Sequence, residues 1–124
     1  MGAPAWEVLY YDLGDDEDAL TELIAKASLG DKQIARINKA FERLEQHGPA
    51  LDGDYFDSVQ GSSERLREFR ITADKVEIRF LFVLRKNCFV MLKGYKKKRK
   101  SDVRHLVPTA EQRLAEWDRK NEKS

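Results

Sequence analysis

The pattern of apolar and polar residues predicts one strand, two helices, three further strands and a last helix. Residues 6–11 are rich in β-forming side chains, which is typical of a strand. Apolar residues then recur every three or four positions through residues 20–27 and 34–44, the spacing of two amphipathic helices. Gly30 is expected to end the first helix, and the sequence His47-Gly48-Pro49 the second. These helices predict a hairpin whose apolar face covers a sheet.

Capping residues predict where the helices begin. Asp15 or Asp16 can cap the first helix and Asp31 the second, because a carboxylate there accepts hydrogen bonds from free backbone N–H groups. Thr109-Ala110-Glu111-Gln112 is a capping-box pattern and predicts the start of the last helix. Residues 48–63 contain several glycine, proline and aspartate residues, so we expect an ordered loop there.

Three strand-like runs, at residues 66–72, 76–84 and 88–95, predict an antiparallel meander because the turns between them are short. Alternation places Arg79 on one face of the middle run with Leu81 and Val83. The other face carries Ile78, Phe80, Phe82 and Leu84. Arg70 is expected to be the cross-strand neighbour of Arg79. The predicted fold class is α/β (α+β): strand-helix-helix, then a three-stranded antiparallel meander and a C-terminal helix. The helical hairpin should cover one face of the sheet, with a basic face exposed opposite.

Length and composition predict a single domain. The chain has 124 residues, of which 41% are hydrophobic, so one core is expected over residues 1–124, ordered from about 5 to 118. No apolar stretch approaches the roughly 20 residues that cross a bilayer, and no signal peptide is recognisable. We therefore expect a soluble, cytoplasmic protein with no membrane partner. Cys88, the single cysteine, lies in an apolar run and is expected to be a buried thiol.

Charge is distributed unevenly, although the net charge is only +1. Residues 1–30 carry seven acids and one base, whereas residues 64–104 carry fourteen bases and five acids. Positive charge is densest over residues 93–100, where six of eight residues are basic. This asymmetry predicts a basic face that attracts polyanions. The alternative is a solvated charge run that only aids solubility.

The sequence offers few conventional catalytic groups. His47 is expected to lie at a helix end and His105 on the surface before the last helix, and no pair of histidines has the spacing of metal ligands. We therefore expect no metal and no cofactor. The candidates that remain lie on the edges and ends of one sheet: Arg70, Arg79, Lys93, Tyr95, Lys96, Lys97 and Lys98.

This set of residues suits attack on a phosphodiester, because fixed guanidinium and ammonium groups stabilise the negative charge of the transition state. In RNA the 2′-hydroxyl can be the nucleophile, so neither a metal nor a covalent nucleophile is needed. The alternative explanation for Arg70 and Arg79 is structural: each could pair with Glu68 or Glu77 across the strands.

Three motifs occur in order along the predicted sheet: Arg67-Glu68-Phe69-Arg70-Ile71, Ile78-Arg79-Phe80-Leu81-Phe82 and Met91-Leu92-Lys93-Gly94-Tyr95-Lys96-Lys97. In order and spacing they resemble the HigB/RelE toxins, especially the phage-derived HigB-like subgroup. The resemblance implies a RelE-like fold and a ribosome-dependent endoribonuclease that cleaves mRNA in the decoding site. It also implies a cognate antitoxin, expected to be a helix-turn-helix protein, as the partner.

By position, the resemblance implies that Arg70, Arg79, Tyr95, Lys96 and Lys97 belong to the site. We expect the two arginines to hold the scissile phosphate and Tyr95 or Lys93 to assist proton transfer. The residues expected to grip the RNA backbone are Lys96, Lys97, Lys98 and Lys100. Lys93 stands where the subgroup often has histidine. A non-catalytic module that binds RNA or an acidic protein through the same basic face is the alternative function.

Overall fold

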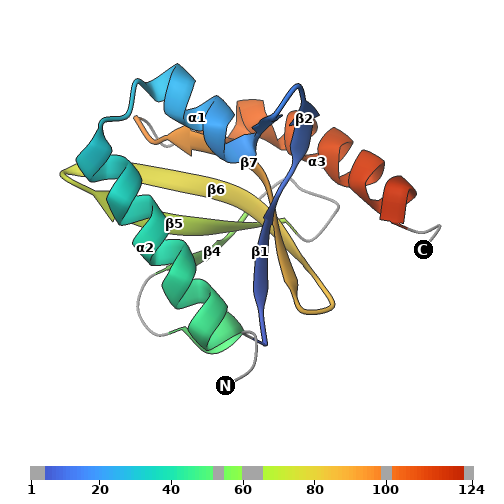
Figure 1. Ribbon diagram of the computed structural model, residues 1–124. Coiled ribbons are helices and arrows are strands. Elements are labelled where there is room, and N and C mark those ends of the chain that lie inside the picture. Colours follow the sequence, from blue (N-terminus) through green and yellow to red (C-terminus); the bar gives the residue numbers. More distant parts are fainter. Residues whose placement is uncertain (1–4, 52–54, 60–65, 99–101, 122–124) are drawn as a thin grey trace.

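A five-stranded sheet lies between two helical layers in the computed structural model, which describes residues 5–51, 55–59, 66–98 and 102–121 (Figure 1). The strand order is β1-β7-β6-β5-β4, with β1 (Glu7–Tyr10), β4 (Phe56–Ser58), β5 (Arg67–Ala73), β6 (Val76–Arg85) and β7 (Cys88–Lys96). The helices are α1 (Ala19–Ala27), α2 (Asp31–His47) and α3 (Asp102–Asn121). Smaller elements are the ribbon of β2 (Asp12–Gly14) and β3 (Glu17–Asp18), and the 3-10 turn η1 (Gly48–Ala50). The predicted α+β fold class is confirmed.

The predicted meander of β5, β6 and β7 is confirmed, with both pairings antiparallel. Its first turn uses Asp74 and Lys75 at φ 50° and 70°, a geometry that matches the twist of the two strands. β1 is added to β7 in parallel, because the chain crosses over through α1 and α2 before it enters the sheet again. The prediction of a loop over residues 48–63 was wrong in part, since β4 pairs with β5 and packs Phe56 against Phe69.

The sheet buries a core on each face. The core under α1 and α2 is aromatic, and Phe41 of α2 packs against both Phe69 and Phe80. The core on the other face lies under α3, whose Val107, Ala110 and Leu114 are buried at the 3-4 spacing of one helix face. The expectation that this second face is exposed was therefore wrong, because α3 covers part of it with apolar side chains.

The helix boundaries differ from the predicted ones. Asp18 caps α1 and accepts hydrogen bonds from the backbone N–H groups of Leu20 and Thr21, both at 2.9 Å. Asp15 and Asp16 were predicted as the cap, but they form the left-handed turn between β2 and β3.

The ends of α1 and the start of α2 also shift by a few residues. α1 ends at Ala27, and Ser28, at φ 52°, is its left-handed C-cap, so the helix ends before Gly30, which was expected to end it. Gly30 is the N-cap of α2, and Asp31 is its first residue instead of its cap.

The last helix begins earlier than the capping box predicted. α3 starts at Asp102 and carries Pro108 and Thr109 in its interior. His105 therefore lies on the exposed side of a helix and not on a segment before it. Within the described residues, no helix is long and apolar enough to span a membrane.

Candidate functional site

Three of the predicted site residues lie side by side on adjacent strands. Arg79 in β6 is in register with Arg70 in β5 and with Tyr95 in β7. The predicted cross-strand neighbourhood of the two arginines is confirmed. We call these three residues the arginine row; they lie on the sheet face that carries α3, since Tyr95 belongs to the core beneath that helix.

Carboxylates neutralise both arginines of the row. Arg79 Nη1 lies 2.7 Å from Glu68 Oε2, and Arg79 Nη2 lies 2.9 Å from Glu77 Oε2. Arg70 pairs with Asp57 of β4. The alternative structural explanation, pairing with Glu68 or Glu77, is thus confirmed for Arg79. Burial lowers the pKa of Arg79, but the hydrogen bonds and charges of the two glutamates outweigh it and raise that pKa.

Glu68 and Tyr95 anchor the row in the interior. The Glu68 side chain is only 4% exposed, and its Oε1 accepts a hydrogen bond of 2.7 Å from Tyr95 Oη. Burial, followed by the contact with Glu68, raises the pKa of Tyr95 above its ordinary value. The phenol therefore stays protonated near neutral pH, and its proton is directed to Glu68.

Arg70 is more accessible than Arg79. Its side chain is 28% exposed and that of Asp57 is 44% exposed, compared with 11% for Arg79. Arg70 Nε is buried without a hydrogen-bond partner among the described residues. Buried donors are nearly always satisfied, so Arg70 retains binding capacity that the fold does not use.

Lys93 is held by a separate ion cluster. Its Nζ donates to Glu22 Oε1 of α1 at 3.0 Å, and Arg113 of α3 lies 2.8 Å from Glu22 Oε2. The pKa of Glu22 is lowered to about 2, chiefly by hydrogen bonds from Arg113. Burial opposes this shift, and Lys93 adds to it. Burial lowers the pKa of Lys93 despite Glu22. Lys93 thus contacts Glu22, and this ion cluster connects β7 to α1 and α3. Lys93 forms no salt bridge with the described carboxylates of the arginine row.

A basic cavity of about 310 Å³ lies beside the row, between α1, the end of β7 and the start of α3. It is lined by Leu23, Lys26, Ala27, Lys93, Gly94, Tyr95, Lys96, Lys98 and Leu106. Gly94 allows this close packing, because a Cβ there would lie 2.6 Å from a ring carbon of Phe80 and 2.9 Å from Leu23. We call it the lysine cavity; Tyr95 is common to the cavity and the arginine row.

The predicted backbone-binding lysines separate into groups. Lys96 and Lys98 are exposed and line the lysine cavity, whereas Lys97 points to Glu77, with 3.8 Å between Nζ and Oε2. Lys100 lies outside the described residues. Sequence reasoning missed Lys26, which is far away in the chain and reaches the cavity only because α1 packs against β7.

The carboxylate partners were also only partly foreseen. Glu68 and Glu77 were considered as partners, but Asp57 and Glu22 were not, because both come from elements whose contacts depend on the tertiary fold. Among the described residues, no group of three or more His, Cys, Asp and Glu side chains could hold a metal ion. Cys88, predicted to be buried, is partly exposed at the start of β7.

Comparison with protein families matches residues 27–115 to the family described as phage derived protein Gp49-like (DUF891). No curated protein matches the sequence. The matched segment contains α2, all three strands of the arginine row and the first part of α3. Because the match covers most of the chain, this protein belongs to the phage-derived Gp49-like family, a family of RelE/HigB-like toxins of toxin–antitoxin systems.

Proposed function

We propose that the protein is the toxin of a type II toxin–antitoxin system and acts as a ribosome-dependent, metal-independent endoribonuclease that cleaves mRNA in the decoding site. The observation that carries the proposal is the register of Arg70, Arg79 and Tyr95 on three adjacent strands, next to the lysine cavity. Membership of a toxin family supports it. The expected partners are the ribosome, mRNA and a cognate antitoxin, and the expected compartment is the cytoplasm.

In the proposed reaction the 2′-hydroxyl attacks the adjacent phosphorus and the bond from phosphorus to the 5′-oxygen breaks. Arg70 and Arg79 stabilise the charge that develops on the non-bridging oxygens. Tyr95 turns its hydroxyl from Glu68 to the departing 5′-oxygen and donates its proton there. Glu77, a half-buried carboxylate beside Arg79, accepts the proton of the 2′-hydroxyl.

Substrate must replace part of the carboxylate shell around the arginines. Asp57 has the most exposed side chain of the three carboxylates, so the phosphate is proposed to displace Asp57 from Arg70. Glu68 stays in place because it is buried and bound by Arg79. Lys96 and Lys98 hold the RNA backbone at the lysine cavity, and Lys97 and Lys100 are proposed to extend this contact.

Primer-extension mapping of a translated mRNA tests the cleavage. The wild-type protein should produce cuts, and Arg70→Gln should reduce cutting on the order of 100-fold, because one charge at the phosphate is lost. Arg85→Gln is the matched control. Arg85 lies in the same sheet and is also ion-paired, with Asp118, but stands outside the row. Cutting by Arg70→Gln at the wild-type rate would refute the assignment.

The second candidate function is that of a non-catalytic binder with a toxin-like fold. The observation that favours it is the neutralisation of Arg70 and Arg79 by Asp57, Glu68 and Glu77. A binder would stall translation at most, so mapping with the wild-type protein would show stops without new 5′ ends. That result would contradict the nuclease function and favour the non-catalytic binder.

A further inference from the structure

A stripe of unpaired positive charge runs along α2. Its members are Lys32, Arg36, Lys39 and Arg43, all exposed, at the 4-3-4 spacing that keeps them on one side of a helix. None of them forms a salt bridge with a residue that the structure describes. We call this set the α2 stripe. It spans about 16 Å, at about 1.5 Å per residue.

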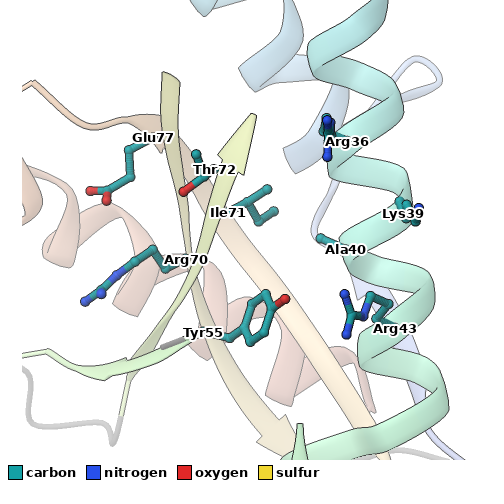
Figure 2. Close-up of a pocket in the computed structure, with 9 residues that line it drawn as sticks. All are labelled: Arg36, Lys39, Ala40, Arg43, Tyr55, Arg70, Ile71, Thr72 and Glu77. Carbon is teal, nitrogen blue, oxygen red and sulfur yellow. The ribbon is translucent and has the colours of Figure 1, made fainter. Parts of the chain in front are cut away.

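A groove of about 570 Å³ lies between the stripe and the edge of the sheet (Figure 2). Arg36, Lys39 and Arg43 line it from α2, and Tyr55 and Ile71 extend toward the helix from the other side (Figure 2). A second hollow of about 560 Å³ continues it past Lys32. The groove therefore combines cations with apolar surface.

The floor of the groove includes an edge of β5 that no described strand covers beyond Arg70. β4 pairs with β5 only as far as Phe69, and Tyr55 O then accepts a hydrogen bond of 2.7 Å from Arg70 N. No described strand pairs with the outer edge of β5 beyond this point. Hydrogen bonds of a strand alternate between its two sides, so the N–H and C=O groups of Thr72 point outward like the N–H of Arg70.

We infer that this groove binds an acidic, extended segment of a partner protein, which adds to the sheet as a strand along β5. Main-chain bonds to Thr72 would fix its register, and its carboxylates would face the α2 stripe. Alternate side chains of a strand repeat at about 7 Å, close to the roughly 6 Å between residues four apart on a helix. The partner is taken to be the antitoxin, and only this identification rests on the proposed function.

The open strand edge and the apolar lining favour a peptide over RNA. An RNA backbone could use the cations but would leave the outward N–H and C=O of Thr72 and the faces of Tyr55 and Ile71 without matched contacts. The groove borders the arginine row, since Arg70 and Glu77 also line it, but the side chain of Arg70 points away from α2 and toward the opposite side of β5 (Figure 2).

Fluorescence anisotropy with a labelled ten-residue peptide of alternating Glu and Val tests the inference on the isolated protein. Binding should weaken about tenfold or more in the triple variant Arg36→Glu, Lys39→Glu, Arg43→Glu. The control variant Lys86→Glu, Arg119→Glu, Lys120→Glu reverses three exposed cations elsewhere and should bind as the wild type does. The same peptide with N-methylated valines keeps its charge but loses the valine N–H groups, which face Thr72 when the glutamates face the stripe, and should bind at least tenfold more weakly. In hydrogen exchange, the Thr72 amide should be protected only by the unmodified peptide.

Three results would overturn the inference: no binding of the peptide, equal binding of its N-methylated form, or binding unaffected by the stripe variant. If a ten-nucleotide uridine RNA binds through the stripe and the peptide does not, the groove is a nucleic-acid surface instead. The assay contains no ribosome and no mRNA, so its outcome is independent of whether the protein cleaves.

Discussion

The arginine row and the α2 stripe are both basic, but only the row has its charge neutralised within the fold. Arg79, with 11% of its side chain exposed, contacts Glu68 and Glu77, whereas the exposed cations of α2 contact no described carboxylate. The reason is solvation. A guanidinium that is taken out of water needs a partner, while an exposed ammonium is stabilised by water itself. Burial therefore explains why Arg79 is paired, and exposure to water explains why the α2 stripe needs no carboxylate.

The comparison predicts opposite effects of truncation in the two regions. In the row, removal of Arg79 leaves the buried anion Glu68 without its charge partner. On the stripe, removal of a cation breaks no salt bridge with a described residue. Four experiments, in order of decreasing expected effect, test this contrast and extend it to Glu22, which lies in the separate ion cluster of Lys93 and Arg113.

Arg79→Ala should lower the free energy of unfolding by about 3–5 kcal/mol, because it leaves Glu68 buried without its charge partner. Arg79 Nη1 lies 2.7 Å from Glu68 Oε2, whose side chain is only 4% exposed. Urea denaturation measures the change. The double variant Arg79→Met, Glu68→Gln should recover much of the loss, since it removes both charges. A loss below about 1 kcal/mol in Arg79→Ala would mean that Glu68 finds another partner or water.

Tyr95→Phe should lower the free energy of unfolding by about 1–3 kcal/mol, because Glu68 Oε1 loses its hydrogen-bond donor while the ring keeps its packing. Thermal or urea unfolding gives the value. Tyr11→Phe is a suitable control, since its hydroxyl also binds a glutamate, Glu116, but nearer the surface. An equal or larger loss in the control would contradict the view that burial sets the size of the effect.

Glu22→Gln should change how stability depends on pH. The pKa of Glu22 is about 2 in the folded protein against an ordinary value of 4.5. Because the folded pKa is the lower one, the carboxylate stabilises the fold above about pH 4.5, and this is lost as the pH falls toward 2. The contribution is about 1–2 kcal/mol, after allowance for solvent screening. Unfolding measured between pH 2 and 7 should show a flatter profile in Glu22→Gln, and an unchanged slope would show that Arg113 and Lys93 do not hold this carboxylate.

Lys39→Gln and Arg43→Gln on the stripe should each change the free energy of unfolding by no more than about 0.5 kcal/mol. Their side chains are exposed and make no salt bridge with a described residue. Their unfolding should also follow the wild-type pH profile. A loss above about 1 kcal/mol in either variant would show that the stripe stabilises the fold, which would remove the distinction between the two regions.

The sequence alone predicted the strands and helices whose apolar residues are regularly spaced. The alternation in β6 separates Ile78 and Phe80 from Arg79, and that spacing is local because successive side chains of a strand point to opposite faces. The row of Arg70 and Arg79 follows from the same rule together with a short turn. The helix starts were less predictable, since Asp15, Asp16 and Asp18 are equivalent by chemistry and only the β2–β3 turn selects Asp18.

The four cations of α2 show what the sequence determined and what it left to the tertiary structure. Their 4-3-4 spacing alone puts them on one side of the helix, but they went unnoticed because residues 31–63 also contain six acids. The linear sequence does not show which charged residues from distant parts of the chain form ion pairs. Packing of α1 on β7 brings Glu22 to Lys93, and β4 brings Asp57 to Arg70. Ion pairs form between groups that come within a few ångströms, and only the tertiary structure decides those distances.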